Sequence, residues 1–328
     1  MDASALSARL LRALETHRTP PSSRDHLPSL AADVLSSAAA RDFPAMFTIW
    51  AAQATGQPTS LTVDAAACWL GLYLAAKIID DVQDREAGLL PASVAPATAL
   101  NLGLTLVFAS QRCLAEASSE SEAARRLELL RHTNAEALAV ALAQQLAWQE
   151  TEADDDLLVA AWQCAAGKGG RPFALAGWLG ACSVGAAPDV AEALRRFGQL
   201  IGEAVQSVDD AMDLIEAKVS DFRSPRGSLA VAYGLRVADE GDRADLVRLL
   251  AGVRGEESGA AEAMRDRLLA MGAARYLSIE TGVRVMRARA LLDALGDKLR
   301  PDGRALLRRT TEMFESETGS LVEGESRA

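Results

Sequence analysis

Long apolar stretches with helical periodicity, separated by prolines, constrain the fold of this chain most strongly. In one of them, apolar residues recur at three- and four-residue steps from Phe197 to Ile215, as in a helix with one buried face. Alanine and leucine dominate a hydrophobic content of 49%, and only 5% of residues are aromatic. The sequence therefore predicts an all-α fold, with its clearest helices at about 62–86, 93–117, 121–150, 154–184, 189–218, 258–296 and 302–316.

The absence of a linker-like segment in the sequence indicates one domain. No linker rich in proline, glycine or serine and no block of like charge divides the 328 residues, so we expect a single domain over 1–328 with flexible ends at about 1–25 and 316–328. Inside the expected helix 154–184, the run Gly167–Pro172 should kink or break the hydrogen-bond ladder.

The charge and the hydropathy pattern narrow the range of partners. A net charge of -11 argues against nucleic acid or an anionic membrane as the main partner, although bound cations would still permit an anionic substrate. Lys77 interrupts the apolar segment Ala65–Ile79 before it reaches the ~18 residues that span a bilayer, and the start of the chain has no secretory signal pattern. We expect a cytoplasmic protein without stable membrane insertion, whose four cysteines are buried reduced thiols.

Two acidic patterns, each at the end of an apolar helical run, carry the chemistry. In a helix, the first and third aspartates of each pattern lie one turn apart on the same face. Mg²⁺ takes such carboxylates together with phosphates and water. Acidic pairs on a helix are commonly only solvated surface, but two sets brought together would repel each other unless cations were bound. The predicted catalytic residues are Asp80, Asp81, Asp84, Asp209, Asp210 and Asp213, with Asp80, Asp84, Asp209 and Asp213 as metal ligands.

Gln206 shares a helix face with Asp209 and Asp213. A neutral amide at this position could orient a carboxylate or a metal-bound water. It could equally be an ordinary polar residue of the helix.

Four segments together resemble the trans-type isoprenyl diphosphate synthases, the polyprenyl synthetase family. Phe197–Asp213 resembles the second aspartate-rich region of that family, and Asp80–Asp84 resembles the first. Asp221–Leu229 is similar to the family's Asp-Leu-x-x-Gly-Lys-x-Thr-Leu stretch, with Arg226 in place of the lysine. Lys168 matches the lysine of the family's Lys-Thr-Gly motif. The matches keep the order of the family from about residue 41 to 230.

The resemblance implies a helical bundle of the isoprenoid synthase (class I terpenoid synthase) type with a central active-site cavity. It implies a homodimer in which three Mg²⁺ ions bridge the two aspartate sets to an allylic diphosphate. Lys168, Arg226, Gln206 and Arg41 would belong to the diphosphate-binding set. The carbon–oxygen bond would ionise because metals and cations stabilise the departing pyrophosphate, while an apolar pocket keeps water from the allylic cation.

The chain departs from the family where isopentenyl diphosphate would bind. The stretch Ala39–Pro44 replaces a Gly-Lys-Arg-x-x-Pro-like motif and keeps only Arg41, and the family's arginine pair falls on Leu89 and Leu90. Each lost charge-assisted bond contributes ~1.5–3 kcal/mol. The sequence therefore favours cyclisation of the allylic cation, or its transfer to another acceptor. Chain elongation with isopentenyl diphosphate is the alternative, and an inactive regulatory subunit is a third reading, against which the six intact aspartates speak.

The helix that carries the first acidic pattern also predicts a prenyl pocket. Below Asp80, the same face carries Ala76, then Tyr73 or Leu72, then Trp69. Trp69 would lie about 16 Å from the metals at ~1.5 Å per residue, a depth that suits a C15 or C20 chain. Tyr73 and Trp69 could equally be core packing. The aromatic candidates for stabilising a carbocation are Phe173, Trp178, Trp162 and Phe108.

Overall fold

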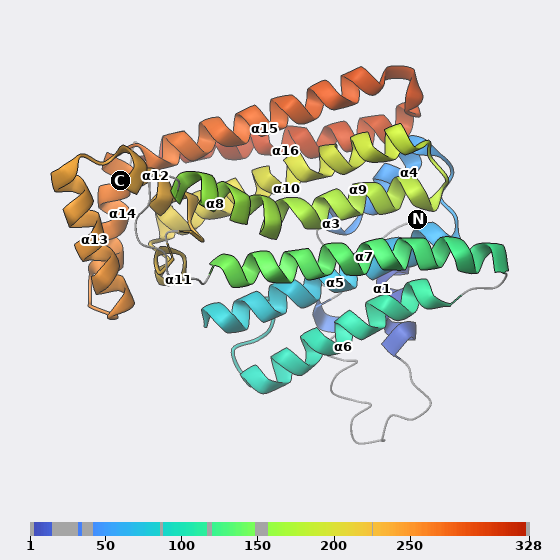
Figure 1. Ribbon diagram of the computed structural model, residues 1–328, viewed down its shortest axis with the longest axis horizontal. Coiled ribbons are helices and arrows are strands. Elements are labelled where there is room, and N and C mark those ends of the chain that lie inside the picture. Colours follow the sequence, from blue (N-terminus) through green and yellow to red (C-terminus); the bar gives the residue numbers. More distant parts are fainter. Residues whose placement is uncertain are drawn as a thin grey trace. The chain divides into compact units, whose positions relative to one another are not determined.

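The computed structural model of the protein describes residues 3–14, 32–34, 42–85, 88–116, 120–147, 157–224 and 226–325. Within these ranges every regular element is a helix (Figure 1), so the all-α prediction is confirmed. In chain order the elements are α1 (Ala3–Leu14), α3 (Asp42–Ala45), α4 (Phe47–Thr55), α5 (Ser60–Asp84), α6 (Pro96–Ala115), α7 (Glu120–Ala147), α8 (Leu157–Ala165), the π-helical turn η2 (Ala166–Gly170), α9 (Arg171–Ser183), α10 (Pro188–Glu216), α11 (Val219–Phe222), α12 (Leu229–Val237), α13 (Glu240–Arg254), α14 (Ala260–Ala270), α15 (Ala273–Leu295), the 3₁₀ turn η3 (Gly296–Lys298) and α16 (Pro301–Glu325).

The contacts of the chain define two compact units. Unit 1 comprises residues 1–137, 175–195 and 295–307, and unit 2 comprises 138–174, 196–294 and 308–328. The single domain expected over 1–328 stays a prediction. The flexible ends expected at about 1–25 and 316–328 stay a prediction as well. Leu6 and Leu10 of α1 are fully buried, and α16 continues to Glu325.

Two glycine-containing segments decide where the predicted helices are interrupted. The expected kink at Gly167–Pro172 takes the form of η2, whose wider turn separates α8 from α9. The single helix predicted over 258–296 is wrong, because α14 ends at Ala270 and α15 begins at Ala273. Gly272 between them has φ +82°, a left-handed conformation that an L side chain rarely adopts.

Helix α5 is the core helix of unit 1. Among the described residues it is the one helix long and apolar enough to cross a membrane, yet 67% of its most hydrophobic window is buried inside the protein. Its polar residue Asp64 is also buried, and its carboxylate accepts hydrogen bonds from Arg9 of α1 and Arg126 of α7. Both arginines also donate to the carbonyl of Cys113 in α6. This ion cluster fixes α5 against three neighbouring helices of unit 1.

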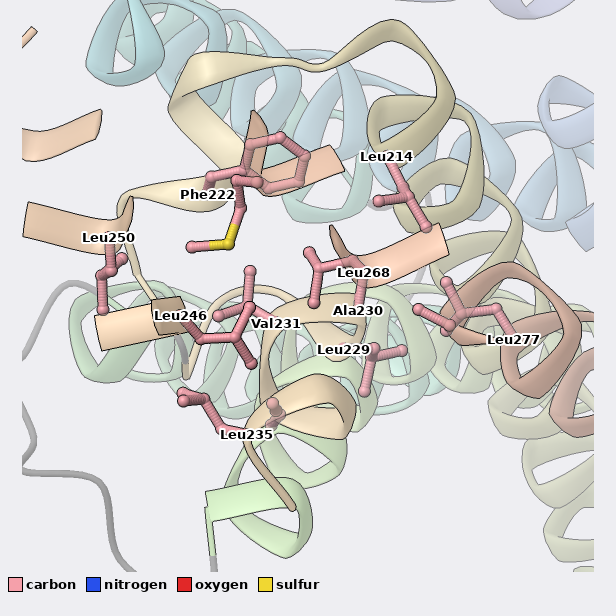
Figure 2. Packing of buried hydrophobic residues seen from close by; sticks show 14 of the residues in the cluster. Leu214, Phe222, Leu229, Ala230, Val231, Leu235, Leu246, Leu250, Leu268 and Leu277 are labelled. Atoms are coloured by element: carbon pink, nitrogen blue, oxygen red, sulfur yellow. The ribbon is translucent and has the colours of Figure 1, made fainter. Parts of the chain in front are cut away.

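Unit 2 has its own hydrophobic core, in which α12 is central (Figure 2). Leu229, Val231 and Leu235 of α12 belong to a buried cluster with side chains of α10, α11, α13, α14 and α15. Leu229 is the first residue of α12, so the core holds the N-terminal end of this helix in place.

Glycines bring η2 and α9 unusually close to α10 within unit 2. A Cβ atom at Gly202 of α10 would overlap the backbone carbonyl of Gly169, and one at Gly198 would overlap the carbonyl of Phe173. Only the absence of side chains at these points permits the contact. The backbone that follows Lys168 is thereby held directly against the helix that carries the second acidic pattern.

Candidate active site

The first acidic motif lies in the last two turns of α5. Asp80, Asp81 and Asp84 are all half-buried, and the helix ends at Arg85, which has a left-handed conformation. The Oδ2 atom of Asp81 accepts a hydrogen bond of 2.9 Å from the backbone N–H of Leu89. The Asp81 carboxylate is therefore hydrogen-bonded to the backbone that follows the helix.

The face of α5 below Asp80 is more open than its opposite face. Ala76 is exposed, Leu72 and Tyr73 are half-buried, and Trp69 is buried, whereas Leu74 and Ile78 on the opposite side are core residues. The rings of Trp69 and Tyr73 are stacked, with their centroids 5.1 Å apart. This gradient from a small exposed residue to a buried indole agrees with a pocket floored by Trp69, which stays a prediction.

The three aspartates of the second motif have different environments on α10. Asp209 is exposed, whereas Asp213 is half-buried and forms a 3.0 Å ion pair with Lys218. Asp210 is only 1% exposed and accepts hydrogen bonds from Gln206 Nε2 at 2.8 Å and from the backbone N–H of Leu229 at 2.7 Å. Burial raises the pKa of Asp210, while these two hydrogen bonds and the charge of Lys168 oppose the rise.

Two cations accompany the second motif within unit 2. Burial raises the pKa of Cys164 in α8, and the charges of Arg226 and Lys168 oppose that rise, so both side chains lie near this thiol. The Nε atom of Arg226 is buried and has no hydrogen-bond partner within the described part of the chain. A guanidinium N–H without a partner is suited to donate a hydrogen bond to an anionic ligand such as a phosphate oxygen.

The donor set fits a divalent cation that is completed by its ligand. No three carboxylate, imidazole or thiol groups of the described ranges are grouped as a metal site. Mg²⁺ is usually held by one or two carboxylates, with substrate phosphates and water completing its coordination. Paired aspartates one turn apart at the end of α5 and again on α10 supply that kind of partial site.

The remaining candidate residues, Arg41 and the aromatic side chains, differ in their surroundings. Arg41 lies outside the described residues. Phe173 is buried, in agreement with an interior position. Phe108 is 58% exposed on α6, and its assignment as a pocket aromatic stays a prediction. Arg284 Cζ lies 3.3 Å from the centre of the Trp162 ring, whose face is thus covered by a cation, and Trp178 packs against His132 at a centroid distance of 3.9 Å.

Sequence reasoning missed two residues of these motifs. Lys218 pairs with Asp213 from five positions downstream, and its basic charge just past the end of α10 was the available signal. Gly88 has no space for a side chain, because a Cβ atom there would overlap the carboxylate of Asp81. Its identity as glycine in a short loop gave no indication of that contact.

Comparison with known proteins decides the family. The model of the polyprenyl synthetase family matches residues 29–267, which is well over half of the chain and includes both acidic motifs. The chain belongs to the polyprenyl synthetase family. It is therefore an isoprenoid enzyme that acts on prenyl diphosphates, and enzymes of this family use divalent metal ions bound to diphosphate. No curated protein matches the chain.

Solved structures confirm the isoprenoid synthase fold of this polyprenyl synthetase. A decaprenyl diphosphate synthase from Rhodobacter capsulatus is 21% identical, with a TM-score of 0.75 over 95% of this chain and 94% of that one. A heptaprenyl diphosphate synthase from Staphylococcus aureus is 16% identical, with a TM-score of 0.78 over 95% and 96%. A polyprenyl synthase from Caulobacter crescentus CB15, solved with calcium and isoprenyl diphosphate, is 19% identical, with a TM-score of 0.78 over 95% and 93%.

Proposed function

We propose that the protein is a Mg²⁺-dependent prenyl diphosphate synthase that ionises an allylic diphosphate and transfers the prenyl group to isopentenyl diphosphate. The observation that carries the proposal is that the charge of Lys168 acts on Asp210 of the second acidic motif, and that Arg226 lies near the same thiol, Cys164, in a member of this family. The names of the similar solved structures support chain elongation better than the cyclisation that the sequence favours.

The proposed roles follow from the chemistry of each side chain. Asp80 and Asp84 of the first motif and Asp209 and Asp213 of the second are the proposed ligands of Mg²⁺, for which we propose three ions. Such ions would supply the positive charge that lets pyrophosphate leave. Lys168 and Arg226 bind diphosphate oxygens, and the unpartnered Nε atom of Arg226 supports its assignment. Gln206 and Arg41 complete the proposed diphosphate-binding set.

The prenyl chain is proposed to lie along the open face of α5. Ala76 leaves room next to the reacting end, Leu72 and Tyr73 line the middle, and Trp69 closes the floor. At ~1.5 Å per residue this length accommodates a C15 or C20 chain. Phe173 is buried as well, and its proposed assignment to the prenyl pocket rests on the sequence.

A second candidate function rests on one observation. Leu89 and Leu90 stand where the family carries an arginine pair, so a second diphosphate lacks two cations at that place. Without isopentenyl diphosphate, the allylic cation would react with its own double bonds to give a cyclic terpene, or with another acceptor.

One incubation separates the two candidates. The purified protein is incubated with Mg²⁺ and geranyl, farnesyl or geranylgeranyl diphosphate, each with and without isopentenyl diphosphate, and the extracts are examined by mass spectrometry. Longer diphosphates that form only with isopentenyl diphosphate support chain elongation. Hydrocarbons or alcohols formed without it support the second candidate. Absence of turnover with all three substrates contradicts both.

Two variants test the site itself. Asp80→Ala and Asp209→Ala should each abolish turnover, because each removes a proposed metal ligand, while the helical circular dichroism stays unchanged. Activity retained in both variants would reject the assigned site. We also propose that the protein is cytoplasmic. We propose that it is a homodimer, and light scattering after size exclusion would test this oligomeric state.

A further inference from the structure

Asp210 is a buried aspartate whose two carboxylate oxygens each accept a hydrogen bond. Oδ1 accepts from Gln206 Nε2 at 2.8 Å, and Oδ2 accepts from the backbone N–H of Leu229 at 2.7 Å. Asp210 is 1% exposed, whereas the adjacent Asp209 is exposed. Asp210 is buried and already serves the N–H of Leu229, which would be costly to leave without a partner, so it is a poorer candidate for a metal ligand than the exposed Asp209.

The hydrogen bond to Leu229 has a consequence for Arg226. Leu229 begins α12, and the turn immediately before it carries Arg226. At the other end of this turn, the hydroxyl of Ser224 donates to the carbonyl of Ala147, the last residue of α7. The turn is thus held at both ends, by Ser224 and by Asp210. Asp210 therefore helps to fix the position of the Arg226 guanidinium.

The first motif repeats this arrangement within unit 1. The middle aspartate of that motif, Asp81, accepts the backbone N–H of Leu89, eight residues further along the chain. Gly88 lies directly against the Asp81 carboxylate, where any Cβ atom would overlap it. In both units, the middle aspartate holds the backbone that follows its own helix.

From these two contacts we infer that Asp81 and Asp210 are positioning residues, and that Asp210 acts through Arg226. This inference deepens the proposed function and rests on it. Metal binding then belongs to the first and third aspartates of each motif. In each unit the middle aspartate fixes the segment that follows it, which is the segment beginning at Gly88 in unit 1 and the turn with Arg226 in unit 2.

Four variants of unit 2 test the role of Asp210. Asp210→Asn keeps an acceptor for the Leu229 N–H, and it pairs with Gln206 when that amide rotates. We expect it to retain the KM for the allylic diphosphate within about threefold, and an unchanged Mg²⁺ half-saturation concentration. Asp210→Ala should raise that KM about tenfold, as the loss of one buried hydrogen bond to the backbone predicts, again with unchanged Mg²⁺ dependence. Asp209→Asn should shift the Mg²⁺ dependence, and Arg226→Ala should raise KM.

Combining two of these changes shows whether Asp210 works through Arg226. If it does, the double variant Asp210→Ala/Arg226→Ala should bind the allylic diphosphate about as weakly as Arg226→Ala alone, because the position of a missing guanidinium no longer matters. Fully additive effects would overturn the inference, as would Asp210→Asn shifting the Mg²⁺ dependence as far as Asp209→Asn. The proposed function fails separately, if Asp209→Asn changes neither activity nor Mg²⁺ dependence.

Gly88→Ala tests the first motif without touching any proposed metal ligand. The new methyl group should displace the Asp81 carboxylate, so this variant should reproduce the kinetic defect of Asp81→Ala with unchanged Mg²⁺ half-saturation. Gly282→Ala is the matched control, because a Cβ atom at Gly282 of α15 meets no atom within 4 Å. Wild-type kinetics for Gly88→Ala would overturn the assignment of Asp81. Circular dichroism and melting temperatures confirm that each variant is folded.

Discussion

Replacing Asp64 by alanine should destabilise the protein far more than removing an exposed ion pair does. Asp64 Oδ1 accepts from Arg9 Nε at 2.5 Å, and Oδ2 accepts from Arg126 Nη2 at 2.6 Å. The exposed fractions of the three side chains are 12% for Asp64, 11% for Arg9 and 6% for Arg126. Asp64→Ala therefore leaves two buried guanidinium groups without their shared carboxylate.

The size of the effect follows from what remains around the two arginines. Two unit charges ~4 Å apart interact by ~4 kcal/mol at an effective dielectric constant of ~20. Breaking a buried pair by removing one partner typically costs about 3–5 kcal/mol. Arg9 keeps an ion pair with Glu116 at 3.1 Å, and Arg126 keeps one with Glu122 at 2.7 Å. We therefore expect a loss of about 3 kcal/mol, at the lower end of this range.

Urea unfolding followed by circular dichroism measures this loss, with a second aspartate as the control. Asp189 of unit 1 forms a 2.7 Å ion pair with Lys298, but these two side chains are 61% and 60% exposed. Asp189→Ala should therefore cost no more than about 1 kcal/mol. A stability loss for Asp64→Ala as small as that for Asp189→Ala would refute the reasoning. Combining Asp64→Leu with Arg9→Met and Arg126→Met should recover most of the loss, because no buried charge then remains.

Further predictions concern the pocket, the helix contacts and pH. Trp69→Ala should lengthen the longest product by removing the proposed floor, and Ala76→Phe should shorten it; chromatography of the dephosphorylated products measures both. Gly202→Ala should destabilise the protein by about 1–3 kcal/mol in urea unfolding, because its methyl group overlaps the carbonyl of Gly169. Burial lowers the pKa of His132, so protonation disfavours the folded state and stability falls as pH drops through the ordinary value of about 6.5. His132→Phe should therefore lose less stability between pH 7 and pH 5 than the wild type, and equal losses would contradict this assignment.

Local pattern was enough to predict the helices, because apolar periodicity reports directly which face of a helix is buried. The same pattern could not tell Asp209 from Asp210. The two residues are adjacent, about 100° apart around the helix axis. Which of them becomes buried depends on α12, which supplies the Leu229 N–H from nineteen residues away. The steric role of Gly88 also depends on a contact across a loop, and sequence spacing gives no access to such contacts.

The single helix predicted over 258–296 failed for a local reason that the pattern conceals. Gly272 allows the chain to turn between two stretches whose apolar residues keep a similar period. In contrast, the run Gly167–Pro172 combined several helix-breaking residues, so its interruption could be predicted although its π-helical form could not.

The π-helical turn η2 has a consequence for the way Lys168 can change. One residue added to an α-helix rotates everything beyond it by about 100°, and a π-type turn absorbs such an addition locally. Deleting a single residue between Ala166 and Gly170 would convert the region to a continuous α-helix. Because η2 absorbs the extra residue, Cys164 of α8 and Phe173 of α9 would keep their faces, and the residues around Lys168 would change position. The number of residues in η2 therefore determines where the Lys168 side chain lies. A one-residue deletion in this turn would move that side chain even though the lysine itself is kept.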